Sequence, residues 1–405
     1  MVNAILAIVA SVVSIWTIEI GLAIGHRFSN PEVWEQDQKS VLSEVLRLHL
    51  KGHPPYQYSV VPNEIEQRLG YPVLSRAANA VYVPCQEAGP PLVMTTDEQG
   101  FHNPPGLWRL QRWSIAILGD SFTEGYCVPS NRNSAALIRQ THPATVNLAR
   151  AGDHPVHQYA KLREFAAPYR PDIVLWFFYE ENDLVNILRL RGEGAHRRMV
   201  YRYLDDPNLN LGLLERQGEI DRMLAEEAAI GLRRLLAEHR LDPQRLDESA
   251  IDAMEAKLVR DRRAERWLYT AKAVLKLTHL RGRLNLLFLR RGHSPEEGAY
   301  PIFEAVMRDS RERIAAWGGR LIVIYIPSTT SFTARIEDPT RARVLEILAR
   351  QQIPLIDMVP ILLGTGKPQS HYAYGMHGGH FNEAGYRLTA EAVLKQLGEW
   401  SVPRP

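Results

Sequence analysis

The stretch 114–125, S-I-A-I-L-G-D-S-F-T-E-G, constrains the fold of this chain more than any other segment. Its first five residues, Ser114 to Leu118, form a short and mostly apolar run, which is typical of a strand buried in a parallel sheet. Gly119 follows, and glycine permits a sharp turn where a Cβ would clash. Ser121 then precedes a segment that can begin a helix. The pattern predicts an open α/β sheet with Ser121 at the carboxyl end of a strand, in the crevice where such sheets bind ligands.

Apolar runs and helical segments alternate along the rest of the chain. Further buried strands are predicted to end at Asn147 or Leu148 and to span 173–178, 320–326 and 353–358, and helices are predicted at 156–165, 341–351 and 388–397. This alternation is typical of α/β proteins in which helices cover both faces of a sheet. We therefore predict a doubly wound, mainly parallel sheet in three layers, of the flavodoxin-like type.

Composition limits the classes of function. The 405 residues include 48 Lys and Arg against 46 Asp and Glu, a formal net charge of +2, so no overall basic field favours nucleic acid. The two cysteines, Cys85 and Cys127, do not form a C-x-x-C pair, and we expect no structural zinc site. A single disulfide can form between them if the chain folds in an oxidising compartment.

The N-terminal stretch Ala4–Gly25 is apolar apart from Glu19 and small hydroxyl side chains. About 20 such residues span the core of a bilayer, and no cleavage site of the A-x-A type accompanies them. We therefore predict an uncleaved transmembrane anchor over residues 1–27, with a buried core helix as the alternative. The basic side chains that follow, Arg27 among them, would place the rest of the chain in the cytoplasm.

Three further residues stand where they could act together with Ser121. Gly152 opens a loop after a predicted strand, and a glycine N–H can approach an oxyanion closely. Asn182 follows the strand 173–178, where its side-chain amide can donate to the same oxyanion. His380 precedes the helix 388–397, and imidazole titrates near neutral pH, as a general base must. We expect Ser121, His380, Gly152 and Asn182 to form a catalytic site.

Metal binding is the alternative use of the histidines near the C-terminus. His371, His377 and His380 lie in a short span, and the H-x-x-H spacing brings two imidazoles close together. No carboxylate stands at ligand spacing beside them, however, so zinc is not expected. The sequence predicts neither a metal nor a cofactor.

Taken in chain order, these motifs resemble the four blocks of the SGNH/GDSL hydrolase superfamily. The segment G-D-S at 119–121 is similar to the nucleophile block, and Gly152, Asn182 and His380 match the characteristic residues of the other three blocks. The resemblance implies an SGNH-like fold and a serine esterase. In such an enzyme Ser121 attacks an ester, His380 is the general base, and the other two residues bind the oxyanion.

The chain resembles in particular the membrane-anchored members found in bacterial surface-polysaccharide systems. The shared motifs are C-x-E at 85–87, D-x-x-G-F-x-N-P at 97–104, G-Y-C-V at 125–128 and E-x-N-D-L at 180–184. This resemblance implies an acylated carbohydrate as the substrate, a catalytic domain in the periplasm or elsewhere outside the cytoplasm, and membrane attachment through the N-terminal helix. Hydrolysis of O-acetyl groups is expected, with O-acetyl transfer, or glycan binding and assembly without catalysis, as the alternatives.

Two positions depart from the superfamily pattern. Most members carry Asp three residues before the catalytic histidine, and here that position, which belongs to the third member of the triad, is His377. Imidazole cannot supply the fixed negative charge that orients His380. A backbone carbonyl, Asp357 or Asp153 replaces that charge, or the site is a Ser–His dyad, or activity is weak. Glu181 stands where related sequences carry Gly.

The predicted organisation has five parts. They are the anchor at 1–27, a helical and loop lead-in at 28–95, the first part of the SGNH-like domain at 96–190, a helical insertion at 191–317 and the second part of that domain at 318–405. Within the lead-in we expect an amphipathic helix at 31–50 and a proline-rich loop at 52–91. The insertion interleaves basic side chains such as Arg260 and Arg290 with acids, which indicates either an amphipathic cap with a solvated face or a lid that contacts anionic lipid or glycan.

Overall fold

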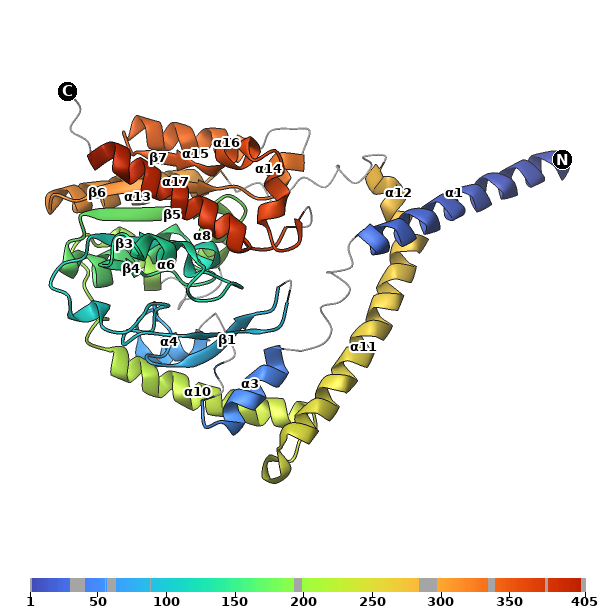
Figure 1. Ribbon diagram of the computed structural model, residues 1–405, viewed down its shortest axis with the longest axis horizontal. Coiled ribbons are helices and arrows are strands. Elements are labelled where there is room, and N and C mark those ends of the chain that lie inside the picture. Colours follow the sequence, from blue (N-terminus) through green and yellow to red (C-terminus); the bar gives the residue numbers. More distant parts are fainter. Residues whose placement is uncertain are drawn as a thin grey trace.

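A five-stranded parallel sheet, in the order β4-β3-β5-β6-β7, forms the centre of the molecule (Figure 1). The computed structural model describes residues 2–29, 41–54, 56, 63–87, 89–192, 199–283, 297–333, 339–375 and 378–401. The strands are β3 Ile115–Leu118, β4 Thr145–Asn147, β5 Ile173–Tyr179, β6 Arg320–Ile326 and β7 Leu355–Asp357. The chain adds β4 on one side of β3 and the later strands on the other, as in a doubly wound sheet. The predicted α/β class with a parallel sheet is therefore confirmed.

Both faces of the sheet are buried, because alternate side chains of each strand belong to different apolar clusters. On β5, Val174, Trp176 and Phe178 belong to one cluster, whereas Leu175 and Phe177 belong to the other. Successive strand residues point to opposite faces, so a strand that is covered on both sides must be apolar throughout. This explains why 173–178 and 320–326 are continuous apolar runs.

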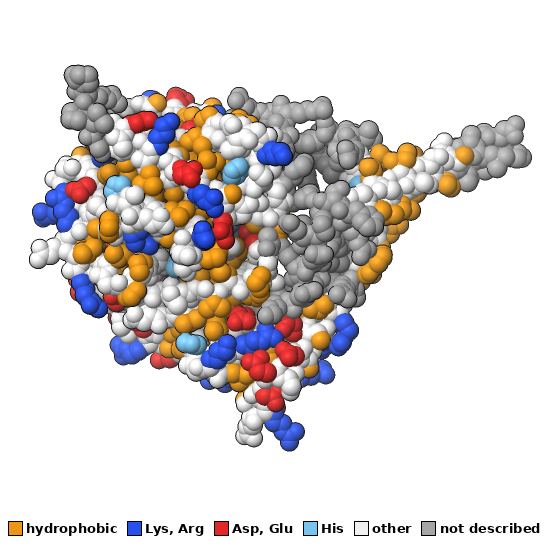
Figure 2. Space-filling model, viewed as in Figure 1, with side chains coloured by type: hydrophobic (Ala, Val, Ile, Leu, Met, Phe, Trp, Pro, Cys, Tyr) orange, Lys and Arg blue, Asp and Glu red, His pale blue; other side chains and the backbone are white. Residues whose placement is uncertain are grey.

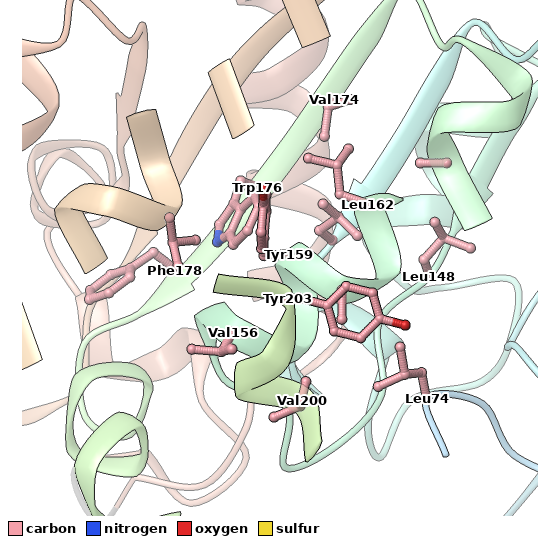
Figure 3. Close-up of a cluster of buried hydrophobic side chains, with 14 of the residues drawn as sticks. Leu74, Leu148, Val156, Tyr159, Leu162, Val174, Trp176, Phe178, Val200 and Tyr203 are labelled. Carbon is pink, nitrogen blue, oxygen red and sulfur yellow. The ribbon is translucent and has the colours of Figure 1, made fainter. Parts of the chain in front are cut away.

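Helices cover each face of the sheet. The cluster that contains Trp176 is covered by α7 Pro155–Lys161, α8 Asp183–Gly192, α13 Ala299–Ala316 and α15 Pro339–Arg350. Figure 3 shows Trp176 and Phe178 of β5 beside Val156 and Tyr159 of α7. The opposite face is covered by α6 Ser134–Arg139, α16 Met358–Gly364 and α17 Glu383–Ser401. Each large apolar side chain buried in this way stabilises the fold by about 1.5–3 kcal/mol.

Short elements complete the domain. The remaining short α-helices are α5 Ser121–Glu124, α9 Arg202–Asp205 and α14 Thr330–Thr333, and a π-helical turn at Leu162–Ala166 continues α7. Short 3₁₀ helices lie at Leu107–Arg109, Ala167–Tyr169, Met199–Tyr201, Pro243–Arg245 and Pro368–His371.

The segment before the sheet is more ordered than the predicted loop. Helix α3 Val41–Leu50 is the described part of the predicted helix 31–50, and residues 31–40 lie outside the described residues. Helix α4 Asn63–Leu69 and strand β1 Val81–Cys85 then form within 52–91, where we expected a loop, and β1 pairs with the antiparallel strand β2 Leu92–Thr95. Pro84 lies inside β1, because an edge strand tolerates a residue that has no N–H to donate.

Two long helices dominate the insertion. They are α10 Gln217–Glu238 and α11 Glu248–Leu275, followed by the short α12 Thr278–Arg283. Helix α11 leads away from the sheet and, with α12, contacts the N-terminal helix α1 Val2–Ser29 (Figure 1). We call α1, α11 and α12 the arm. Within it, Glu19 is buried and accepts hydrogen bonds from the backbone N–H groups of His279 at 3.0 Å and Leu280 at 2.6 Å.

The predicted transmembrane helix over Ala4–Gly25 is not found. Among the described residues, none of the helices combines the length and the apolar character that crossing a bilayer requires. Glu19, the only acidic side chain of α1, caps the N-terminus of α12 through its carboxylate.

Candidate active site

Ser121 is the first residue of α5, directly after β3. The turn that places it there requires glycine at position 119, since a Cβ on Gly119 would lie 2.0 Å from Oγ1 of Thr123. The carboxylate of Asp120 accepts a hydrogen bond from the Phe122 backbone N–H at 2.9 Å and so caps this short helix. Ser121 is 7% exposed, and its hydroxyl is therefore held at the carboxyl end of β3, as the sequence predicts.

His380 lies beside this hydroxyl although the two residues are 259 positions apart. The Nε2 atom of His380 is 2.7 Å from Oγ of Ser121. The rings of Phe122 and Tyr126 flank the imidazole, with centroid distances of 4.8 and 4.6 Å. A short bridge between Tyr372 and Phe381 fixes the loop that carries His380 against the start of α17. The structure therefore brings together the two side chains on which nucleophilic catalysis depends.

The other ring nitrogen of His380 contacts a carboxylate that sequence reasoning did not assign. Nδ1 of His380 is 2.7 Å from Oε1 of Glu87, and Oε2 of Glu87 accepts the backbone N–H of His380 at 2.9 Å. With a proton on Nδ1, the free Nε2 can accept the hydroxyl hydrogen of Ser121. The carboxylate thus fixes the ring orientation and the tautomer that a general base needs.

The other candidates for this role lie elsewhere. Asp357 pairs with Arg341 and caps α16 by accepting the Val359 N–H at 3.0 Å. Asp153 pairs with Arg150 and Lys161 within a buried cluster. Neither acid orients His380, and a dyad without a carboxylate is not what the structure contains.

His377, at the usual position of the acid, lies outside the described residues. Glu87 comes instead from the loop between β1 and β2, before the nucleophile in the chain. Catalytic constellations recur with their members in different chain orders, so a search confined to the histidine's own loop could not find Glu87. The available signal was the C-x-E motif at 85–87, whose cysteine forms a disulfide with Cys127, the pairing that the composition left open.

The two predicted oxyanion donors lie close to the helix that carries Ser121. Gly152 is exposed and has a φ of +85°, a conformation that favours glycine. Its neighbour Ala151 donates its N–H to Oε2 of Glu124, the last residue of α5, at 2.7 Å. The amide of Asn182 donates to Oδ2 of Asp120 at 3.1 Å. An amide nitrogen carries two hydrogens, so a second one is left for a ligand.

Buried carboxylates support these donors. Burial raises the pKa of Asp120 to about 6, and the hydrogen bond from Asn182 opposes that rise. Burial and the nearby charge of Asp120 also raise the pKa of Asp183 well above its ordinary value. Asp183 accepts the Tyr179 N–H at 2.9 Å, which ties the end of β5 to the start of α8. The Asp183 side chain thereby closes the loop that carries Asn182, and Asp120 contacts Asn182 itself.

Ser130 and His102 form a second serine–histidine pair with different surroundings. Nε2 of His102 is 2.9 Å from Oγ of Ser130, but Nδ1 of His102 lies 2.8 Å from the carbonyl oxygen of Glu124. Burial lowers the pKa of His102. Because a carbonyl carries no full negative charge to stabilise an imidazolium, this pair does not have the electrostatics of a triad.

Among known proteins, this chain is similar to several solved structures. No protein-family model matches the sequence, and no curated protein matches it. TesA is 12% identical with a TM-score of 0.35, over 70% of this chain and 97% of that one. A lipase/acylhydrolase from Enterococcus faecalis is 13% identical with a TM-score of 0.36, over 72% and 98%. A two-domain esterase active on acetylated mannans is 10% identical with a TM-score of 0.36, over 74% and 52%. Similarity at this level assigns no function.

Proposed function

We propose that this protein is a serine esterase with the catalytic triad Ser121–His380–Glu87. The observation that carries the proposal is the unbroken series of contacts from carboxylate to imidazole to hydroxyl, with both distances at 2.7 Å. Such a series makes the serine oxygen nucleophilic at neutral pH, because the base can take its proton and the acid stabilises the resulting imidazolium.

In the reaction, His380 takes the hydroxyl proton while Ser121 Oγ bonds to the carbonyl carbon of an ester. The negative charge moves to the carbonyl oxygen, where the N–H groups of Ser121 and Gly152 and the amide of Asn182 bind it. Each such donor typically lowers the barrier by about 3 kcal/mol. The alcohol leaves with the proton from His380. Water then gives its proton to His380, attacks the acyl-enzyme and releases the carboxylic acid and free Ser121.

The substrate class that we propose is an O-acylated carbohydrate, with O-acetyl groups of a cell-surface polysaccharide as the first choice. The resemblance of the motifs at 85–87, 97–104, 125–128 and 180–184 supports this choice. An O-acetyltransferase would use the same acyl-enzyme but transfer it to a sugar hydroxyl in place of water. The non-catalytic alternative depended on the absence of an acid, and Glu87 fills that role in the geometry.

We also propose that the chain associates with a bilayer surface through the arm. Among the residues whose side chains the structure describes, most of the large apolar ones that are exposed lie there: Val12, Val13, Ile15, Ile18, Ile20 and Ile24 on α1, and Trp267, Leu268 and Leu275 on α11. Figure 2 shows hydrophobic side chains along this projecting part of the molecule. At about 100° per residue, those on α1 point in directions around most of its circumference. A protein groove would cover one side only, whereas lipid acyl chains can surround a helix that is apolar on most sides.

Vesicle binding tests the role of the arm. The paired substitution Ile18→Asn and Ile20→Asn should weaken co-sedimentation with vesicles of phosphatidylglycerol and phosphatidylcholine. Leu363→Asn is the matched control, because Leu363 is similarly exposed but lies on α16, outside the arm. Equal binding by both variants and the parent would contradict the proposal. The Cys85–Cys127 disulfide supports an oxidising compartment outside the cytoplasm as the location.

Turnover of nitrophenyl acetate tests the esterase proposal. Ser121→Ala should reduce turnover by at least about 10³-fold, since loss of a triad serine removes the acyl-enzyme route. Ser130→Ala is the matched control, because it removes the hydroxyl of the second serine–histidine pair. Equal turnover in Ser121→Ala and the parent would eliminate the esterase.

A further inference from the structure

The loop that carries Glu87 does not belong to the central sheet. It connects β1 and β2, which form a separate two-stranded sheet. Within the described residues, no strand pairing joins this sheet to β3–β7. The packing that aligns Ser121 with His380 therefore does not by itself place Glu87. Other contacts must fix the position of the hairpin relative to the nucleophile.

Two of those contacts lie at the residues immediately before Glu87. The disulfide joins Cys85, two residues before Glu87, to Cys127, six residues after Ser121, with the Cα atoms 5.7 Å apart. The hydroxyl of Tyr126 donates to the carbonyl of Pro84. Both connections run from the segment just after α5 to the end of β1. They tie the acid to the same short stretch of chain that carries the nucleophile.

The conformation of Cys127 agrees with a position fixed by its surroundings. Its backbone φ is +63°, in the left-handed region that residues other than glycine and asparagine seldom adopt. A residue in this conformation persists only where the surrounding structure enforces it. The turn after α5 thus presents the sulfur of Cys127 to β1.

We infer that the Cys85–Cys127 disulfide is a positioning element of the catalytic site, which acts by holding Glu87 within hydrogen-bond distance of His380. The inference rests on the proposed esterase function. A displacement of about 1 Å in a catalytic constellation can cost about 100-fold in rate. Cleavage of the disulfide removes the covalent connection two residues before Glu87, although the hairpin keeps its hydrogen bonds and its packing against α3. The activity of the enzyme should therefore depend on the oxidised state of this pair.

Chemical reduction of the Cys85–Cys127 disulfide tests the inference. A dithiol such as dithiothreitol gives two electrons and two protons to the disulfide, which yields the thiols of Cys85 and Cys127, and becomes a cyclic disulfide itself. Turnover of nitrophenyl acetate is measured before reduction, and again after reduction and removal of the dithiol under nitrogen, because a free dithiol cleaves this ester itself. Both the full-length parent and Glu87→Gln are measured in this way. If the disulfide acts through the acid, reduction lowers the parent's kcat at least about 10-fold and changes Glu87→Gln by less than about 2-fold.

Three controls complete the design. The double variant Cys85→Ser and Cys127→Ser should have the kcat of the reduced parent and should not respond to dithiothreitol. Near-ultraviolet circular dichroism shows whether the reduced protein keeps its tertiary packing. Reoxidation should restore kcat in the parent.

The outcomes are decisive. An equal fold-loss on reduction in the parent and in Glu87→Gln overturns the inference, because the disulfide then acts independently of the acid. Loss of the near-ultraviolet signal on reduction also overturns it, since the disulfide then maintains the domain as a whole. No change in the parent overturns it as well. If Ser121→Ala is as active as the parent, the esterase proposal fails first, and this result is separate from the other three.

Discussion

The Nδ1 atom of His380 lies 2.7 Å from Oε1 of Glu87, a residue 293 positions earlier in the chain. The same carboxylate also accepts the backbone N–H of His380. Two hydrogen bonds to one carboxylate fix both the ring and its loop. The three side chains are therefore arranged as in a triad, although position 377, the usual place of the acid, carries histidine.

Glu87→Gln should reduce kcat by roughly 10³- to 10⁴-fold, because a neutral amide neither stabilises the imidazolium nor enforces the tautomer. Asp357→Asn is the matched control, since Asp357 was a candidate for the same role but pairs with Arg341. That variant should keep its kcat and lose stability instead. Steady-state kinetics with nitrophenyl acetate provides the measurement, and comparable kcat losses in the two variants would contradict the assignment of Glu87.

Asn182→Ala should lower kcat by about 10²- to 10³-fold with little change in KM, as loss of one oxyanion donor does. Asn186→Ala is the control, because Asn186 lies about one helical turn further along α8. A loss confined to KM would indicate that Asn182 binds the substrate in its ground state, and it would remove Asn182 from the oxyanion site.

Glu124→Gln should destabilise the protein by about 3–5 kcal/mol, because it leaves the buried cation of Arg76 without its carboxylate. Glu124 also accepts hydrogen bonds from Tyr82 and the Ala151 N–H, at 2.9 and 2.7 Å. Glu226→Gln breaks the exposed pair with Arg68 and should cost less than about 1 kcal/mol. Urea denaturation of both variants measures the difference in the free energy of unfolding. Similar losses of stability in the two variants would contradict a buried ion pair between Arg76 and Glu124.

Asp183→Asn should raise the melting temperature near neutral pH and leave it nearly unchanged at acid pH. Burial and Asp120 raise the pKa of Asp183 well above the ordinary value of 3.8, so the folded protein retains a proton that the unfolded chain releases. Between these two pKa values, stability falls as the pH rises. An asparagine carries no such proton, and its amide oxygen can still accept the Tyr179 N–H.

Melting curves of Asp183→Asn and the parent from about pH 4 to about pH 8 provide the measurement. The difference in melting temperature should grow with pH. A constant difference over that range would show that the substitution acts through packing and not through titration.

Most of the central sheet follows from local sequence. The runs 173–178 and 320–326 match β5 Ile173–Tyr179 and β6 Arg320–Ile326 almost residue for residue, because strands that are buried on both faces must be continuously apolar. The position of Ser121 has a similarly general reason, since it follows β3 and parallel sheets gather their functional residues at the carboxyl ends of the strands. His380 instead comes from the loop between the 3₁₀ helix Pro368–His371 and α17.

Glu87 could not be found in this way. It lies in a hairpin loop, where no periodicity marks a residue, and its role depends on a disulfide and on a partner 293 positions away. The prediction of a loop at 52–91 was wrong for a related reason. The prolines that suggested a loop are also compatible with an edge strand such as β1. The N-terminal prediction rested on a count of apolar residues, from which the contact between Glu19 and α12 could not be foreseen.

Covalent labelling by a fluorophosphonate tests the central claim most directly, because this reagent bonds only to a serine oxygen that a neighbouring base has activated. Intact-mass spectrometry and peptide mapping should locate one adduct, on Ser121, in the parent protein and in Ser130→Ala, and should find none in Ser121→Ala. An adduct of equal yield in Ser121→Ala, or no adduct on Ser121 in the folded parent, would contradict the account.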